Sequence, residues 1–240
     1  MKTISTIIFD AYETIATNSI EQWSSSFGEI CQKFQFHVDP TALWRTWKDF
    51  ETRFRETRIG GVKERKNADF KSYRDAWHDC FVESFDVYNL NGDPNDATNL
   101  LIKHMAEREL YEDVATGLLK INTMWRTAVL SNADDEFLLP MLESNSLNFD
   151  AVLSSEKAKS YKPDASIFFT MLDTLNVEAS ECVYVGDDPY ADVFGARRAG
   201  FNTVWINRDE RDYVTDIVAP DARISSFLEL PLIVESMSRV

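Results

Sequence analysis

The sequence lacks the features of a membrane protein and of a disulfide-bonded secreted protein. No apolar run approaches the roughly 20 residues that span a bilayer, so we expect no transmembrane helix. The first residues enter a strand pattern at once, without the layout of a signal peptide, which predicts a cytoplasmic protein. The chain has only 3 cysteines in 240 residues. Cys31, Cys80 and Cys182 lie far apart in apolar patterns, so we expect buried free thiols.

Positive charge is also scarce. The chain has 25 Lys and Arg against 40 Asp and Glu, a formal net charge of −15. A chain this acidic is repelled by a phosphate backbone, which argues against nucleic acid as a partner. The 3 histidines all lie outside the motifs described below, so we assign them no role. The sequence has no internal repeats and no low-complexity segment.

Two kinds of hydrophobic pattern are present. After a first apolar strand, apolar residues recur at helical spacing for about ninety residues, and the pattern then changes to strands that alternate with helices. We expect strands at 4–9, 127–130, 151–153, 182–185, 203–206 and 217–218, with helices at 113–124, 135–146, 163–176 and 188–199. Such alternation predicts a parallel sheet covered on both faces. The predicted fold class is therefore α/β, a doubly wound, Rossmann-like core (1–16 and 107–240) with an inserted all-helical domain (17–106).

Asp10 directly follows the first predicted strand. Open α/β sheets bind ligands at the carboxyl ends of their strands, so its carboxylate is well placed for chemistry. It could act as a covalent nucleophile or as a metal ligand, or it could simply cap the turn.

Two further strands lead into polar residues. Ser131 and Asn132 follow the strand at 127–130, and a hydroxyl there can hydrogen-bond an anionic substrate oxygen. Lys162 precedes Pro163, which is placed to start a helix. A lysine at this point can neutralise carboxylate and oxyanion charge, although a solvated surface lysine is an equal alternative.

A cluster of carboxylates follows the strand at 182–185. After Gly186 come Asp187 and Asp188, and Asp192 lies four residues further on. Asp188 suits the N-cap of a helix, which would place it on one helix face with Asp192. Clustered carboxylates repel one another unless a cation lies among them, and hard oxygen ligands suit Mg²⁺.

In combination and order, these signals resemble the four motifs of the haloacid dehalogenase superfamily of aspartate-nucleophile hydrolases. The resemblance covers the whole chain. It implies that Asp10 is the nucleophile, that Ser131 and Lys162 hold the anionic substrate, and that the insert is a helical cap domain. Such caps close over the active site and supply substrate contacts.

The resemblance also implies a Mg²⁺ site. Its expected ligands are Asp10, the backbone carbonyl of Tyr12, Asp187, Asp188 and Asp192. Thr14 and Asn132, which neighbour the motifs, are expected to contact the substrate.

Two features point to different reactions. Phosphatases of this superfamily usually carry a general acid–base aspartate two residues after the nucleophile. Tyr12 occupies that position, and a tyrosine with an ordinary pKa of about 10 is a poor proton shuttle near neutral pH. A tyrosine at this position resembles the 2-haloacid dehalogenases, whose halide leaving group needs no proton. Glu13 is a further departure, because the turn usually carries glycine or aspartate there.

The fourth motif points to a phosphatase. The dehalogenases that the chain resembles work without a metal and lack the Gly-Asp-Asp form. We therefore expect Mg²⁺-dependent hydrolysis of a small phosphorylated substrate through an aspartyl-phosphate. The alternatives are a 2-haloacid dehalogenase and a binding protein that kept the fold and the metal site without the activity.

The insert is expected to determine the substrate. Its aromatic stripes fall at helical spacing and predict its own core. Residues 45–74 hold ten Lys and Arg against five Asp and Glu, and indicate either solvated helix faces or an anion-attracting lid. Hinges are expected near 15–18 and 105–112. The expected partner is a small anionic molecule, and the chain is expected to be a monomer or a homodimer.

Overall fold

The computed structural model describes residues 3–59, 70–213 and 216–238, which belong to two compact units. The first unit comprises Met1–Thr17, Glu109–Ala133 and Asn145–Val240. The second comprises Asn18–Arg108 and Asp134–Ser144, and all the regular elements among its described residues are helices. As expected, the three cysteines are free and buried. Among the described residues, no helix has the length and apolar character needed to cross a membrane.

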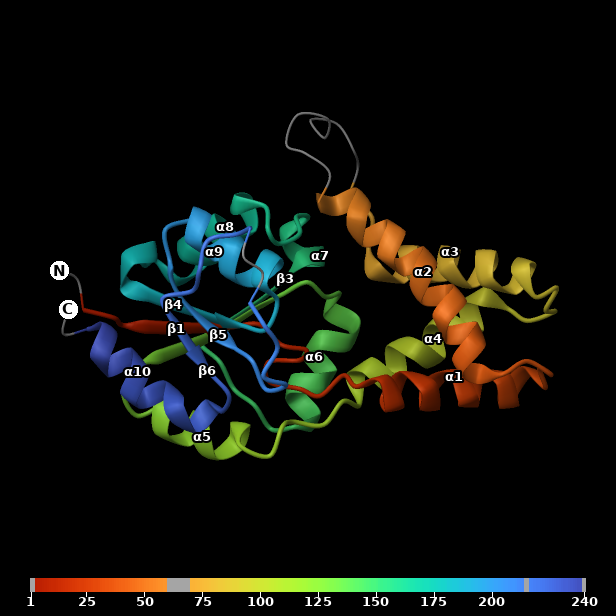
Figure 1. Ribbon diagram of the computed structural model, residues 1–240, viewed down its shortest axis with the longest axis horizontal. Coiled ribbons are helices and arrows are strands. Elements are labelled where there is room, and N and C mark those ends of the chain that lie inside the picture. The colour runs from red at the N-terminus through yellow and green to blue at the C-terminus, as the bar shows by residue number, and fades with distance from the viewer. Residues whose placement is uncertain (1–2, 60–69, 214–215, 239–240) are drawn as a thin grey trace. The chain divides into compact units, whose positions relative to one another are not determined.

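The first unit is built on a six-stranded sheet in which all neighbouring strands run parallel (Figure 1). Its order is β3-β2-β1-β4-β5-β6. The strands are β1 (Thr6–Phe9), β2 (Arg126–Ser131), β3 (Ala151–Ser154), β4 (Cys182–Gly186), β5 (Asn202–Ile206) and β6 (Ala222–Ile224). This confirms the predicted α/β class and parallel sheet.

The predicted last strand was misplaced. Ile217 and Val218 lie in an irregular loop, where the Val218 carbonyl accepts a hydrogen bond from the Tyr213 hydroxyl at 2.8 Å. The edge strand β6 is formed instead by Ala222–Ile224, which pairs with β5. Two adjacent β-branched residues gave a strand signal without the alternation that distinguishes a strand from a loop.

Helices cover both faces of the sheet (Figure 1). One face carries α8 (Ala165–Leu175) and α9 (Gly195–Arg198), and the other carries α5 (Val114–Ile121) and α10 (Leu230–Met237). The short helix α7 (Ser155–Ala158) follows β3 directly. Neither α7 nor α10 is among the helices expected from the sequence patterns.

Two predicted helix starts need correction. Helix α8 begins at Ala165 and not at Pro163, because Asp164 is its N-cap and accepts a hydrogen bond from Ser166 N at 2.8 Å. The predicted helix at 188–199 begins as a π-helical segment, η2 (Pro189–Phe194), and continues as α9.

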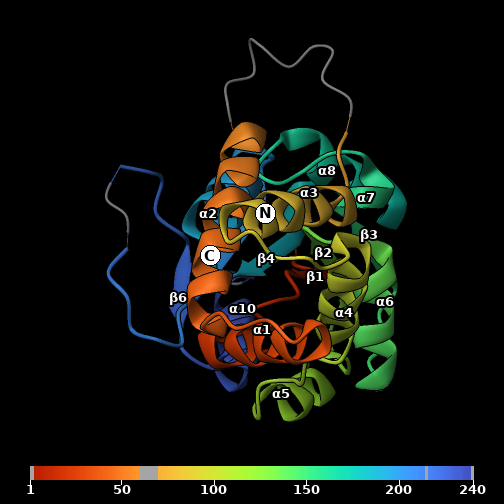
Figure 2. The same ribbon diagram turned by 90° about the vertical axis from the view of Figure 1, so that its right-hand side faces the viewer.

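The second unit contains α1 (Ile20–Phe34), α2 (Pro40–Ile59), α3 (Tyr73–Val87), α4 (Pro94–Ala106) and α6 (Asp135–Ser144) (Figure 2). The expected aromatic core is confirmed. Trp47 and Trp77 are buried with their ring centroids 6.0 Å apart, and Trp23 lies 5.5 Å from Trp47. The adjacent glycines Gly60 and Gly61 predict a turn within the insert, and these residues lie outside the described part of the chain.

Helix α6 groups with the helical unit, although its residues fall within the expected sheet core, 107–240. The Asp134 carboxylate accepts hydrogen bonds from Tyr73 N at 3.0 Å and Arg74 N at 2.8 Å, and so caps the start of α3. Phe137 stacks on Trp77 with ring centroids 5.2 Å apart. Phe137 of α6 is buried and thus contributes to the aromatic core of the helical unit.

Candidate active site

The aspartates of the site follow the two central strands of the sheet, β1 and β4. The chain builds β2 and β3 on one side of β1, then β4, β5 and β6 on the other, so the strand order reverses between β1 and β4. In open α/β sheets such a switch point forms the ligand crevice. Phe9, the last residue of β1, is level with Val185 of β4, which places Asp10 and Asp187 just past the ends of adjacent strands.

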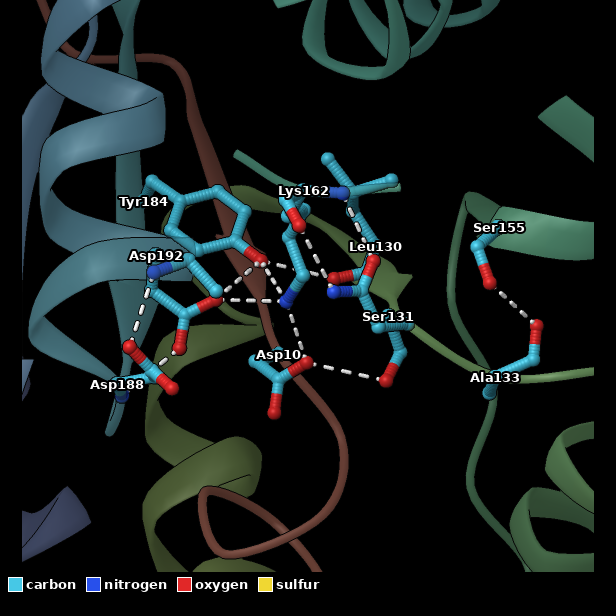
Figure 3. Close-up of polar contacts among 11 residues, drawn as sticks. Asp10, Leu130, Ser131, Ala133, Ser155, Lys162, Tyr184, Asp188 and Asp192 are labelled. Carbon is cyan, nitrogen blue, oxygen red and sulfur yellow. Dashed lines mark hydrogen bonds and ion pairs between the residues drawn. The ribbon is translucent and has the colours of Figure 1, made fainter. Parts of the chain in front are cut away.

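Asp10 is nearly buried, and its two carboxylate oxygens differ in environment. Oδ1 accepts hydrogen bonds from Lys162 Nζ at 2.6 Å and from Ser131 Oγ at 3.0 Å (Figure 3). Oδ2 receives neither of these bonds. The arrangement fixes the carboxylate through one oxygen and leaves the other for attack on an electrophile.

Lys162 is buried beside Asp10 and keeps its charge. Burial alone would lower its pKa, but the carboxylates of Asp10 and Asp192 raise the pKa well above its ordinary value. Asn132 fixes the backbone of this lysine, since its amide accepts from Lys162 N at 2.8 Å and donates to Lys162 O at 3.1 Å. Asn132, predicted to bind substrate, therefore uses both ends of its amide on the loop that carries Lys162.

The three aspartates of the fourth motif have different environments. Asp192 is buried, and its two oxygens accept from Lys162 Nζ at 2.6 Å and from Asp188 N at 3.0 Å. Asp188 is exposed and caps η2, with Oδ1 accepting from Tyr190 N at 2.7 Å and Ala191 N at 2.9 Å. Asp187 is half-buried, and its carbonyl accepts from Trp205 Nε1 at 2.8 Å.

Asp10, Asp187 and Asp192 bring carboxylate oxygens within 4.8 Å of one another. Burial, followed by repulsion from Asp192 and Asp10, raises the pKa of Asp187 well above its usual range. Burial likewise raises the pKa of Asp192 to about 7, despite the opposing effect of Lys162. Concentrated negative charge of this kind, offered by hard oxygen ligands, suits a divalent cation such as Mg²⁺. Asp10 and Asp187 fit such an ion best, because both oxygens of Asp192 are already hydrogen-bonded.

The turn after Asp10 is tight. Glu13 N donates to Ala16 O at 2.8 Å, and Ala16 N donates to Ala11 O at 2.9 Å. Glu13 adopts a left-handed conformation with φ of 67°, which explains why the turn favours glycine at this point. Thr14 is fully buried, and its hydroxyl is not among the groups that converge on Asp10.

The Glu13 side chain bonds to a residue outside the predicted motifs. Its carboxylate accepts a hydrogen bond from the Tyr111 hydroxyl at 3.0 Å, and burial raises its pKa. Tyr12, beside it, is half-buried. Sequence reasoning also missed Tyr184, whose hydroxyl contacts Lys162 Nζ at 2.8 Å. The only sequence signal was a tyrosine within an otherwise aliphatic buried strand.

Comparison with known proteins relates the chain to two kinds of hydrolase. The profile of the haloacid dehalogenase-like hydrolase family matches residues 4–200. (S)-2-haloacid dehalogenase 1 of Pseudomonas sp. (strain CBS-3) is 28% identical over 236 residues, 96% of both chains. N-acylneuraminate-9-phosphatase of Mus musculus is 34% identical over 139 residues, which cover 57% of this chain and 55% of the phosphatase. The match to this phosphatase thus spans about half of its length.

Solved structures support the fold. A putative hydrolase of the same superfamily from Bacillus subtilis, YfnB bound to magnesium, is 18% identical with a TM-score of 0.78, and the match covers 97% of this chain and 99% of that one. The L-2-haloacid dehalogenase RSc1362 is 22% identical with a TM-score of 0.79, covering 98% and 100%. At these identities the likeness concerns the fold alone, and it matches the doubly wound sheet described above.

Proposed function

This chain belongs to the haloacid dehalogenase-like hydrolase family, and we propose that it hydrolyses a small phosphorylated substrate in a Mg²⁺-dependent reaction. One observation carries the proposal. The buried carboxylate of Asp10 shares its site with Asp187 and Asp192, three acidic groups whose oxygens lie within 4.8 Å. A metal-free reaction has no need for this concentration of negative charge, whereas a site for a dianionic phosphate and its counter-ion does.

In the proposed reaction Asp10 is the covalent nucleophile. Its Oδ2 attacks phosphorus and the ester P–O bond breaks, so that an aspartyl-phosphate forms and the departing alkoxide takes a proton from solvent. Water then attacks the phosphorus, which releases inorganic phosphate and regenerates the Asp10 carboxylate. Lys162 and Ser131 hold Oδ1 throughout, so the attacking oxygen keeps its direction. Bound Mg²⁺, held by Asp10 and Asp187, would supply positive charge beside the dianionic phosphate.

The turnover rate of this enzyme should depend strongly on the leaving group. Tyr12 stands where phosphatases of the family usually place the acid that protonates the departing oxygen. Because a phenol is a weak acid, alkyl phosphates should turn over slowly and aryl phosphates much faster.

A panel of phosphate esters, assayed with Mg²⁺ and with EDTA, tests the proposal. We expect phosphate release from p-nitrophenyl phosphate that requires Mg²⁺ and is lost in Asp10→Asn. No release from any activated ester, or release that EDTA leaves unchanged, would contradict the proposal.

A second candidate is hydrolytic dehalogenation of a 2-haloacid. Two observations favour it: Tyr12, and the similarity to (S)-2-haloacid dehalogenase 1 over 96% of both chains. Asp10 would displace halide from carbon, and water would cleave the resulting ester. Halide release from bromoacetate measures this activity directly, and EDTA should not affect it. Absence of release with and without Mg²⁺ would exclude this candidate.

A further inference from the structure

We propose that Tyr184 is a positioning residue that holds the Lys162 ammonium and, through it, the nucleophilic carboxylate of Asp10. The inference rests on the proposed role of Asp10 as nucleophile. Tyr184 lies on β4, outside the four motifs, and its hydroxyl reaches the same ammonium that fixes Asp10 Oδ1 (Figure 3).

The hydrogen bonds around Lys162 leave no donor unused. An ammonium has three N–H groups and no acceptor. Lys162 Nζ has three acceptors within hydrogen-bonding distance: Asp10 Oδ1 at 2.6 Å, Asp192 Oδ1 at 2.6 Å and the Tyr184 hydroxyl oxygen at 2.8 Å. Two of the partners are charged, and Tyr184 is the neutral third that fixes the rotation of the ammonium group.

The direction of each bond at Tyr184 follows from the chemistry of its neighbours. Lys162 can only donate, so the phenol oxygen accepts from it. The single phenol proton is then available for the Leu130 carbonyl, 2.8 Å away, which can only accept. The other acceptor within reach, Asp192 Oδ1, is more distant at 3.3 Å. One hydroxyl group therefore links Lys162 to the end of β2.

This link joins both groups that hold Asp10 Oδ1. Leu130 precedes Ser131, whose hydroxyl donates to the same oxygen as Lys162 does. Because Tyr184 bonds the Leu130 carbonyl and the Lys162 ammonium together, it sets the spacing between these two donors. Loss of the hydroxyl would leave each donor in place but free to move relative to the other.

The ring of Tyr184 is fixed in the core between the sheet and helices α8 and α9. It is 1% exposed and makes edge contacts with Phe168 and Phe201, at centroid distances of 5.4 and 6.2 Å. A ring held in this way gives its hydroxyl a defined position. Phenylalanine would keep this packing and remove only the hydroxyl.

The first test compares Tyr184→Phe with Tyr88→Phe. Tyr88 belongs to the helical unit, where its hydroxyl donates to Ala42 O at 3.3 Å and lies 3.1 Å from Thr46 Oγ1. We expect kcat for p-nitrophenyl phosphate to fall about tenfold or more in Tyr184→Phe, with KM within about twofold of wild type. Tyr88→Phe should lower thermal stability similarly and leave kcat unchanged. A purely structural role for Tyr184 predicts the same kcat in both variants, and that result would overturn the proposal.

The second test needs no enzymatic activity. In protein labelled with ¹⁵N-lysine, the Lys162 ammonium should give a slowly exchanging NMR signal that Lys162→Met removes. Because Tyr184 accepts one of its three N–H groups, the signal should broaden or vanish in Tyr184→Phe. An equally persistent signal in both proteins, or none in wild type, would overturn the proposal. If wild type hydrolyses no phosphate ester, this comparison still decides the contact, so the two proposals can fail separately.

Discussion

The carboxylate of Asp192 lies directly against the backbone of Gly186. A Cβ built at position 186 would stand 2.3 Å from both Cγ and Oδ2 of Asp192, closer than any real Cβ contact. The glycine therefore permits Asp192 to reach Lys162 Nζ and Asp188 N at the same time. Gly186 is not among the residues with positive φ, so its backbone conformation does not require glycine. The close approach of Asp192 explains why glycine stands at this point of the fourth motif.

Gly186→Ala should destabilise the protein by about 1–3 kcal/mol, because the methyl group must displace a buried, hydrogen-bonded carboxylate. Urea unfolding measures the change. Gly28→Ala is the matched control, since a Cβ there meets nothing within 4 Å and position 28 lies inside α1. It should be neutral or stabilising by about 0.5–1 kcal/mol. Equal effects of the two substitutions would contradict the close contact at Gly186.

Adjacent carboxylates should differ in their effect on Mg²⁺ binding. Asp187→Asn removes a charge from the site and should raise the Mg²⁺ dissociation constant about tenfold or more. Asp188→Asn should leave it nearly unchanged, because Asp188 caps η2 and asparagine is an equally good N-cap. Calorimetric titration of Mg²⁺ into each protein makes the comparison. A larger effect at Asp188 than at Asp187 would show that the ligands have been assigned to the wrong residues.

Glu51 should make the stability of the protein depend on pH. Burial would raise its pKa, but Arg55 and Lys48 outweigh this and lower the pKa from 4.5 to about 2. A carboxylate with a lower pKa in the folded state stabilises that state above pH 4.5 and loses the effect as the pH falls toward 2.

Wild type should therefore be more stable than Glu51→Gln by about 1–3 kcal/mol at neutral pH, and the difference should shrink on acidification. Urea unfolding at several pH values measures it. Glu56→Gln, an exposed carboxylate on the same helix, controls for the change in net charge. If the advantage of wild type over Glu51→Gln were the same at every pH, ionisation of Glu51 would not be its source.

Tyr12→Asp should restore the missing acid. If Asp10 is a phosphatase nucleophile, the variant should accelerate hydrolysis of alkyl phosphates by about 10²-fold and affect p-nitrophenyl phosphate much less, because its leaving group needs no proton. The test is to plot the hydrolysis rates of a series of esters against the pKa of the leaving alcohol. The slope should be shallower for Tyr12→Asp than for wild type. Tyr12→Asn controls for removal of the ring. An equal gain with all esters, or in both variants, would argue against acid catalysis.

The sequence predicted the architecture well because the signals were local and periodic. The alternating strands and helices after residue 112 indicated the parallel sheet. The helical spacing before it indicated four of the five helices found in the described part of the second unit. The exception was α6, which was predicted as a helix but placed in the sheet core. Its membership of the helical unit depends on Phe137 meeting Trp77, a contact that no local pattern encodes.

The site could be predicted only to the level of its motifs. The order of Asp10, Ser131, Lys162 and the aspartate cluster identified residues that the structure brings together. The different roles of the aspartates within the cluster could not be predicted from the sequence. Asp187, Asp188 and Asp192 are chemically alike, and only their burial and their hydrogen-bond partners in the folded chain distinguish them.

The helical unit is assembled from two stretches of chain, and this sets an order for events during synthesis. All its parts exist once Ser144 has left the ribosome, whereas the sheet still lacks β3, β4, β5 and β6 at that point. Strand β1 is made first but acquires its neighbour β4 only after 172 further residues have been added between Phe9 and Cys182. We therefore expect the helical unit to fold before β1, which carries the nucleophile Asp10 at its end, can pair with β4. A nascent chain stalled at the point where Ser144 has just emerged from the ribosome should already protect the tryptophan core from proteolysis.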